Sequence, residues 1–291
     1  MKKTRCQSLR FLTVSTLLCL CPSSSHAEKL LEFRFNKPGT FAPSSPDALS
    51  PLVLSLKNPE GNLVDLHGQK GSGVSGKSGD RAFDCTSATG MGKVSDKLPQ
   101  PAPATYIGPV AIAEDETSLL SGLKSYTIQG WFKTDGSVIT GVARLVHFAN
   151  AQDSAGKTVI DLAGNLNGGT LFLGITTPTA TRKEPVDTKA FYNAYDMVNQ
   201  WVFFALTYRK NEFSFYVGDA VNTAALAGVS KGDGATGDVP TILSIGNTQT
   251  PKRPFKGWID NIRIYGSADE EKGALSISDL EMLRKLDASG L

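Results

Sequence analysis

Residues 201–209 read WVFFALTYR, residues 212–218 EFSFYVG, residues 240–246 PTILSIG and residues 256–265 KGWIDNIRIY. Each run is short, rich in aromatic and β-branched residues, and flanked by Gly, Pro, Asn or Asp. Such runs are typical of strands that are separated by turns. They predict an antiparallel β structure for the last third of the chain.

Similar runs extend this pattern toward the N-terminus. Residues 31–36 alternate apolar and polar side chains, as in a half-buried strand. Further runs occupy about 51–56, 62–66, 81–85, 104–113, 124–133, 142–149, 157–162 and 169–176. No helical pattern of 10–15 residues alternates with them, which argues against a parallel α/β sheet. Two segments rich in Gly, 86–103 and 227–239, are expected to be exposed loops.

One helix is predicted near the C-terminus. Ser278 and Glu281 have the spacing of a capping box, in which each residue bonds the backbone N–H of the other. Leu280, Leu283 and Leu286 then recur on one helical face. We expect this face to pack on a sheet edge or rim.

The first 27 residues have the layout of a secretory signal peptide. Residues 1–10 are basic, residues 11–21 are apolar, and Ser25-His26-Ala27 provides small residues before a cut. The apolar run is shorter than the ~20 residues that a membrane anchor needs. We therefore expect a signal peptide at 1–27 and a single exported domain at 28–291, located in the periplasm, on the cell surface or outside the cell.

Charge and cysteine content narrow the function classes. The formal net charge of +2 becomes −2 without the four basic residues of the signal, so nucleic acid and anionic membranes are not expected partners. No apolar run after residue 21 is long enough for a membrane span. Cys85 is the one cysteine after residue 27, so we expect no intramolecular disulfide and a buried thiol.

A glycine-rich stretch matches the phosphate-binding loop pattern G-x-x-x-x-G-K-S. It runs from Gly71 to Ser78. That loop works only when a helix N-terminus follows it and faces the phosphates. Here Gly79-Asp80 and the strand-like RAFDC of 81–85 follow instead. The stretch therefore predicts an ordinary connection between strands and no bound nucleotide.

The order of the four C-terminal runs, closed by SISDLEMLRK at 276–285, resembles a known family. LLEFRF at 30–35 and YTIQGWF at 126–132 fit the same order. The chain is similar to the laminin-G-like jelly-roll domain of the concanavalin A-like lectin/glucanase superfamily over nearly all of 29–286. The resemblance implies an all-β, two-sheet antiparallel jelly-roll sandwich with a short C-terminal helix. It also implies glycan or protein binding, a structural Ca²⁺ in some members, and glucanase activity in a few relatives.

Catalysis is not favoured by the residues. The laminarinase-type relatives carry E-x-D-x-E or E-x-D-x-x-E on one strand, so that the acids share a face. This chain lacks that spacing, and the contiguous acids of 114–116 alternate between faces. Of the two histidines after residue 27, His147 lies within RLVHFAN and is expected to be a core or interface residue.

A calcium site is one interpretation of two aspartates. Asp260 is expected to share the inward face of its strand with Trp258, Ile262 and Ile264, and a carboxylate there needs a partner. That partner is either a set of hydrogen bonds or a cation. The resemblance makes Ca²⁺ reasonable, with Asp84 as a co-ligand.

A glycan site is predicted just before the strand at 201–209. The segment FYNAYDMVN places Tyr192, Asn193, Tyr195 and Asp196 in a polar loop. Aromatic rings stack on sugar faces and amide or carboxylate groups bond hydroxyls, although such rings also pack loops onto a sandwich. We therefore expect an exported, non-catalytic module that binds glycans. The alternatives are an adhesive domain that binds a surface protein and, less favoured, a divergent glycoside hydrolase.

Overall fold

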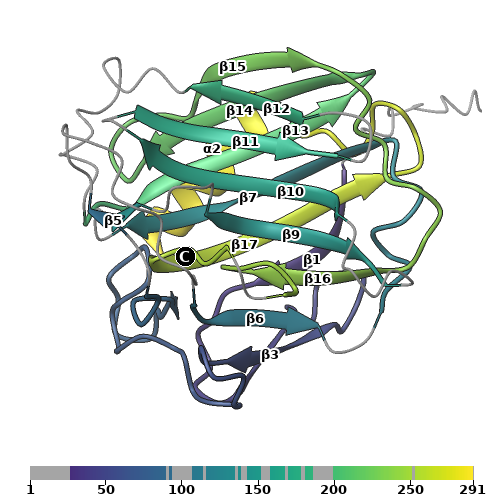
Figure 1. Ribbon diagram of the computed structural model, residues 1–291. Coiled ribbons are helices and arrows are strands. Elements are labelled where there is room, and N and C mark those ends of the chain that lie inside the picture. Colours follow the sequence, from purple (N-terminus) through teal and green to yellow (C-terminus); the bar gives the residue numbers. More distant parts are fainter. Residues whose placement is uncertain are drawn as a thin grey trace, which may run out of the picture.

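The structure is a computed structural model that describes residues 27–89, 92–93, 107–113, 116–134, 137–138, 143–151, 158–167, 170–177, 181–185, 199–250 and 253–290. Two large antiparallel sheets pack face to face, and one helix lies behind them (Figure 1). This arrangement confirms the predicted jelly-roll sandwich with a short C-terminal helix.

One sheet has the strand order β1-β17-β7-β13-β14-β15, and β4 pairs with β17 beside this path. Its strands are β1 (Glu28–Phe33), β4 (Phe83–Asp84), β7 (Ser125–Thr134), β13 (Val202–Arg209), β14 (Glu212–Asp219), β15 (Ala225–Lys231) and β17 (Gly257–Ser267). The first strand pairs with the last one, with Glu28 opposite Gly266 and Phe33 opposite Ile262.

The second sheet has the order β12-β11-β10-β9-β16-β6-β3-β2. Its strands are β2 (Phe41–Pro43), β3 (Val53–Lys57), β6 (Val110–Ala113), β9 (Arg144–Asn150), β10 (Thr158–Asn167), β11 (Thr170–Thr176), β12 (Thr181–Pro185) and β16 (Thr241–Ile245). Two short strands, β5 (Gly92–Lys93) and β8 (Ser137–Val138), pair separately.

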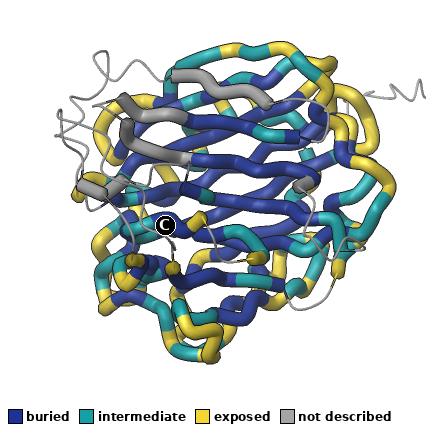
Figure 2. The backbone as a smooth tube through the Cα atoms, in the orientation of Figure 1, coloured by how far each residue is buried: buried dark blue, intermediate teal, exposed yellow. Residues whose placement is uncertain are grey.

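The main core fills the space between the sheets. Figure 2 shows both sheets as mostly buried, with exposed backbone concentrated in the connections. The fully buried side chains come from both layers, and they include Phe33, Leu54, Phe83, Ile128, Phe148, Phe204, Phe215, Leu243 and Ile262. Cys85 belongs to the same core, and burial raises the pKa of its thiol well above the usual value. The cysteine is therefore a packed apolar side chain, as expected.

A β-bulge interrupts β17. The register with β7 shifts between Asp260 and Arg263, and Asn261 has a left-handed φ of 49°. The extra residue changes which side chains share a face. Ile259 and Ile262 both belong to the inter-sheet core, whereas Asp260 does not. The expected inward face for Asp260 is therefore wrong, because the sequence pattern assumed an unbroken period of two.

Helix α2 (Ile277–Ser289) begins two residues earlier than expected. Its N-cap is Ser276, whose Oγ accepts from the Asp279 N–H (3.2 Å), and the Asp279 carboxylate accepts from the Ser276 N–H (3.1 Å). This is the capping box, so its assignment to Ser278 and Glu281 is wrong. Glu281 instead accepts from the backbone N–H of Ala224 (2.9 Å).

The helix packs on the outer face of the first sheet and not on its rim. Leu280 joins a second cluster with Trp131, Phe203 and Ala205, which come from β7 and β13. The buried positions of α2 are Leu280, Arg284 and Asp287, while Leu286 is exposed. The predicted leucine face is therefore only partly correct, because two charged residues share the buried face.

Two strand boundaries also differ from expectation. The segment 227–239, expected to be a loop, is part of strand β15 as far as Lys231. In this strand Lys231 lies opposite Glu212 of β14, and Ala225 lies opposite Val217. The expected strand at 62–66 is reduced to a single bridge between Lys57 and Leu63. In both segments, pairing with a neighbouring strand decides the outcome and local composition does not.

The helix orientation gives a first prediction. Leu280→Ala removes apolar volume between α2 and the sheet, so it should lower the free energy of unfolding by about 2–5 kcal/mol. Leu286→Ala is the matched control, and its exposed position predicts a change within about 0.5 kcal/mol. Urea unfolding of both variants measures this. Equal losses would show that the helix packs through another face.

Candidate functional site

The four residues predicted to bind glycan lie outside the described residues. Tyr192, Asn193, Tyr195 and Asp196 fall between β12 and Asn199. Their role stays a prediction. Trp201, which follows this segment in the sequence, is half-buried, and the Lys133 ammonium lies 5.2 Å from the centre of its ring.

Asp260 and Asp84 lie on neighbouring strands but have separate partners. Asp260 is fully buried, and its two oxygens accept from the backbone N–H groups of Val74 (3.0 Å) and Asn261 (2.7 Å). Asp84 lies opposite Trp258, and its Oδ1 accepts from the N–H and hydroxyl of Thr86 (2.8 and 2.6 Å). Hydrogen bonds thus supply the partner that a buried Asp260 requires.

These contacts do not build a cation cage. Calcium takes six to eight oxygen ligands, and the described residues contain no group of three or more His, Cys, Asp or Glu side chains that could hold a metal. Burial, followed by the nearby Asp80 carboxylate, raises the pKa of Asp260 well above its usual range. Calcium binding at Asp260 and Asp84 stays a prediction.

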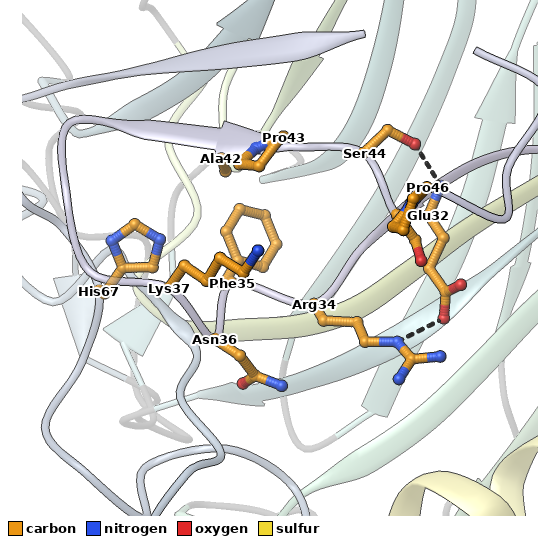
Figure 3. Close-up of a pocket in the computed structure, with 11 residues that line it drawn as sticks. Glu32, Arg34, Phe35, Asn36, Lys37, Ala42, Pro43, Ser44, Pro46 and His67 are labelled. Carbon is orange, nitrogen blue, oxygen red and sulfur yellow. Dashed lines mark hydrogen bonds and ion pairs between the residues drawn. The ribbon is translucent and has the colours of Figure 1, made fainter. Parts of the chain in front are cut away.

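A pocket of about 150 Å³ lies where β1 ends, between β2 and His67 (Figure 3). Phe35 is at its centre and has a left-handed φ of 53°, which turns the chain away from the sheet. The Phe35 ring stacks on Phe83 with 5.4 Å between centroids and an angle of 21°. The ring is therefore held rigidly, with part of it lining the pocket. Ala42 and Pro43 of β2 provide an apolar wall opposite.

His67 lies at one end of this pocket, beside Lys37. Its side chain is 1% exposed, and Nδ1 lies 2.8 Å from Asp65 Oδ1. The carboxylate assigns the proton to Nδ1, so Nε2 of the neutral ring is an acceptor. Nε2 is buried and has no hydrogen-bond partner among the residues that the structure describes. A buried acceptor without a partner is costly, and a ligand hydroxyl is one group that could satisfy it.

Polar side chains from the segment that follows β1 line the rest of the pocket. Arg34, Asn36 and Lys37 are exposed, and Arg34 Nε donates to Glu32 Oε1 (2.8 Å). Asn36 Oδ1 accepts from the Arg81 N–H (2.8 Å), which leaves its NH₂ group directed elsewhere. The pocket thus combines an apolar floor with convergent donors and one acceptor, the usual composition of a small-ligand site.

A buried ion network fixes the end of the pocket at Glu32. Glu32 Oε1 accepts from Arg263 Nε (2.7 Å) and its Oε2 accepts from Lys29 Nζ (2.7 Å). Both terminal nitrogens of Arg263 donate hydrogen bonds to the Asp287 carboxylate of α2 (2.7 and 2.8 Å). Trp131 Nε1 donates to the same carboxylate (2.9 Å). Burial alone would raise the pKa of Glu32, but Arg263, Lys29 and Arg34 outweigh it and lower the pKa to about 2.

The remaining candidates from the sequence are structural. His147 is buried, and its Nδ1 lies 3.3 Å from Asp161 Oδ1, which also pairs with Arg144 Nε (2.5 Å). Trp131 is fully buried under α2. Trp258 is half-buried, and the Lys133 ammonium lies 4.6 Å from the centre of its ring.

The glycine-rich stretch of 71–78 is followed by turns and by β4, and no helix begins there. No helix among the described residues is long and apolar enough to cross a membrane.

Comparison with known families decides the classification. A family model described as the concanavalin A-like lectin/glucanases superfamily matches residues 108–272, more than half of the chain. The chain belongs to this superfamily. No curated protein matches it. This superfamily is the one that the order of the C-terminal strands predicted from the sequence.

Several solved structures are similar to this chain. Trypanosoma rangeli sialidase is 13% identical with a TM-score of 0.51, and the match covers 90% of this chain and 33% of that one. Domain 4 of an extracellular arabinanase from Geobacillus stearothermophilus, in complex with arabinotriose, is 16% identical with a TM-score of 0.48, over 89% and 99% of the two chains. The CBM40 of a Ruminococcus gnavus sialidase, bound to α2,3-sialyllactose, is 15% identical with a TM-score of 0.37, over 56% and 83%. The neighbours thus include carbohydrate-binding modules and glycosidases.

The sequence did not indicate the pocket at Phe35. Its lining comes from residues 32–46 and from His67, and this grouping depends on how the chain turns after β1. One signal was present in the sequence. His67 is one of two histidines after residue 27, and it follows Asp65 at a spacing that allows the observed carboxylate contact.

The ion network predicts acid sensitivity. The pKa of Glu32 is about 2 in the folded chain against an ordinary 4.5, so ionised Glu32 stabilises the fold above pH 4.5 and this contribution is lost as the pH falls toward 2. The shift corresponds to about 3 kcal/mol. Urea unfolding at pH 7, 5, 4 and 3 should show a smaller pH dependence in Glu32→Gln than in the wild type, by about 2 kcal/mol, because part of the contribution is still present at pH 3. Parallel pH profiles for the two proteins would contradict the assigned pKa.

Proposed function

We propose that the chain is an exported, non-catalytic carbohydrate-binding module that uses the pocket at Phe35. The chain belongs to the concanavalin A-like superfamily, and its structural neighbours include carbohydrate-binding modules. The observation that carries the proposal is the buried His67 Nε2, an unpartnered acceptor in a small pocket with an aromatic floor.

The pocket suits one sugar ring. A cavity of ~150 Å³ holds a six-membered ring such as benzene. Phe35 is 3% exposed and closes the base of the pocket, while the exposed Pro43 and Pro46 add apolar surface for the C–H groups of a sugar. A hydroxyl can donate to His67 Nε2, while the Asn36 amide and the Arg34 guanidinium can donate to other oxygens. Binding then rests on stacking and hydrogen bonds, with no bond broken in the ligand.

The predicted loop residues belong to the same proposal as a separate contact surface. Tyr192, Asn193, Tyr195 and Asp196 precede Trp201, and they would add stacking and hydrogen bonds of their own. Ca²⁺ at Asp260 and Asp84 would order the sheet end. Each contribution is separable by experiment, because the pocket at Phe35 contains none of these residues.

Glycan binding is tested with residues 28–291 on a glycan array, with Ca²⁺ and with a chelator. We expect binding to one coherent group of sugars. His67→Phe removes the acceptor but keeps a flat ring, and it should weaken binding of the same sugars about tenfold, the effect of about 1.4 kcal/mol. Lys124→Gln is the matched control, because Lys124 is exposed and does not line the pocket. Asp65→Ala should weaken binding as well, since the ring proton can then move to Nε2.

The outcomes separate the alternatives. A blank array from folded protein would reject glycan binding and favour an adhesive domain that binds a surface protein. Binding that is unchanged in His67→Phe would move the site away from this pocket, and Tyr192→Ala with Tyr195→Ala would then be measured. Loss of binding with the chelator would support the calcium site, and Asp260→Asn would identify the ligand.

Export predicts a processed N-terminus. The full chain, expressed in a bacterium with an intact secretory pathway, should yield a mature protein that begins at Glu28. Intact-mass measurement of the periplasmic or secreted fraction checks this. Ala27→Leu should block the cut and retain the longer form. An uncut chain confined to the cytosol would contradict export.

A further inference from the structure

We infer that the pocket at Phe35 continues into a second hollow and that the joined groove takes an acidic oligosaccharide, with carboxylate groups on its sugars. This inference rests on the proposed function and names the class of ligand. The second hollow, of about 460 Å³, lies between residues 75–80, the bulge at Asn261 and the end of α2. Arg34 and Asn36 line both hollows.

The two hollows are neighbours, because Arg34 and Asn36 line both. In Figure 3, Arg34 and Asn36 lie on the side of Phe35 away from Ala42 and Pro43. A ligand in the first pocket that extends past these two side chains enters the second hollow. The second hollow is several times larger than a single ring requires, so the groove favours a chain of sugars over a monosaccharide.

The glycine-rich stretch forms one wall of the second hollow. Gly71 and Gly76 have left-handed φ values of 79° and 67°, which only glycine adopts without strain, and they fold the stretch into tight turns. Asp80 Oδ2 accepts from the N–H and hydroxyl of Ser75 (2.7 Å each), and this fixes the turn. The stretch is thus a rigid wall that presents Lys77 and Ser78 to the groove.

The acids along the groove are already engaged. Glu32 is surrounded by Arg263, Lys29 and Arg34, and Asp287 forms a two-bond pair with Arg263. Asp80 Oδ2 is engaged by the N–H and hydroxyl of Ser75. Most oxygens of these carboxylates are therefore bonded within the chain, and few of them are left to bind a cationic ligand.

Three cations along the groove keep donors for a ligand. Lys37 has no partner within the described part of the chain, and Lys77 donates only to the backbone carbonyl of Gly290 (3.1 Å). Arg34 uses Nε for Glu32, which leaves its terminal nitrogens directed to the groove. Lys37, Arg34 and Lys77 thus line successive parts of the groove, an arrangement that fits carboxylates on successive sugars.

The test compares acidic and neutral forms of the same sugar chain. The probes are a six-unit oligogalacturonic acid, its carboxyl-reduced product, and the pair sialyllactose and lactose, each titrated calorimetrically at 50 and 300 mM NaCl. We expect an acidic probe to bind at least tenfold more tightly than its neutral partner, and less tightly at high salt. The two acidic probes distinguish a uronic acid chain from a single terminal sialic acid, and the groove length favours the uronic acid chain.

Two substitutions locate the effect. Lys77→Gln, outside the pocket at Phe35, should weaken binding of the acidic chain two- to fivefold, the range for one exposed ion pair, and leave the neutral chain unchanged. Lys37→Gln should weaken binding of the acidic chain by a larger factor than binding of the neutral chain. Lys124→Gln is the matched control, because Lys124 is exposed and lines neither hollow. Thermal unfolding confirms that each variant is folded.

The possible results are distinct. Equal binding of acidic and neutral chains, or equal losses in Lys124→Gln, would overturn this inference and leave glycan binding intact. Binding of sialyllactose alone would overturn the oligosaccharide part, because a single carboxylate would then suffice. No binding of these probes, together with neutral sugars retained on the array, would overturn the acidic ligand class. A blank array would reject the proposed function itself.

Discussion

The buried guanidinium of Arg263 is the interaction on which the arrangement depends. It holds Glu32 of the first strand and Asp287 of the last helix at the same time, and Trp131 of the central strand bonds the same aspartate. A buried charge is tolerated only when its partners are close and well oriented. Removing either carboxylate would leave buried guanidinium N–H groups of Arg263 without their acceptor. The network therefore specifies where β1, β7, β17 and α2 meet, and the pocket and the second hollow lie on either side of it.

The bulge in β17 makes this network possible. Without the shift at Asn261, Arg263 would lie on the same face as Ile259 and would enter the inter-sheet core. With the shift, Ile262 and Ile264 return to the core while Arg263 faces α2. One residue in a left-handed conformation thus separates an apolar layer from a charged one. The same turn forms part of the wall of the second hollow.

The class of fold follows from the sequence because alternation, turn residues and strand order all agree. Local detail did not follow where two patterns compete or where long-range contacts decide. Ser276-x-x-Asp279 and Ser278-x-x-Glu281 overlap, and the first pair forms the cap while Glu281 accepts from the Ala224 N–H and from Arg284. Arg284 and Asp287 are buried because their charges are paired, which hydrophobic periodicity cannot detect. The pocket needs residues from distant segments, so only the folded chain reveals it.

The pairing of β1 with β17 has a consequence for how the chain folds. Residues near positions 28 and 266 must meet before the first sheet is complete, and Asp287 must arrive before the terminal nitrogens of Arg263 have their acceptors. Contacts of such long sequence separation form late, since closing a loop of that length costs entropy before any stabilisation is gained. A growing chain of this topology stays incomplete until nearly all of it has been synthesised. Such a delay would keep it in the extended form that a narrow translocation channel requires.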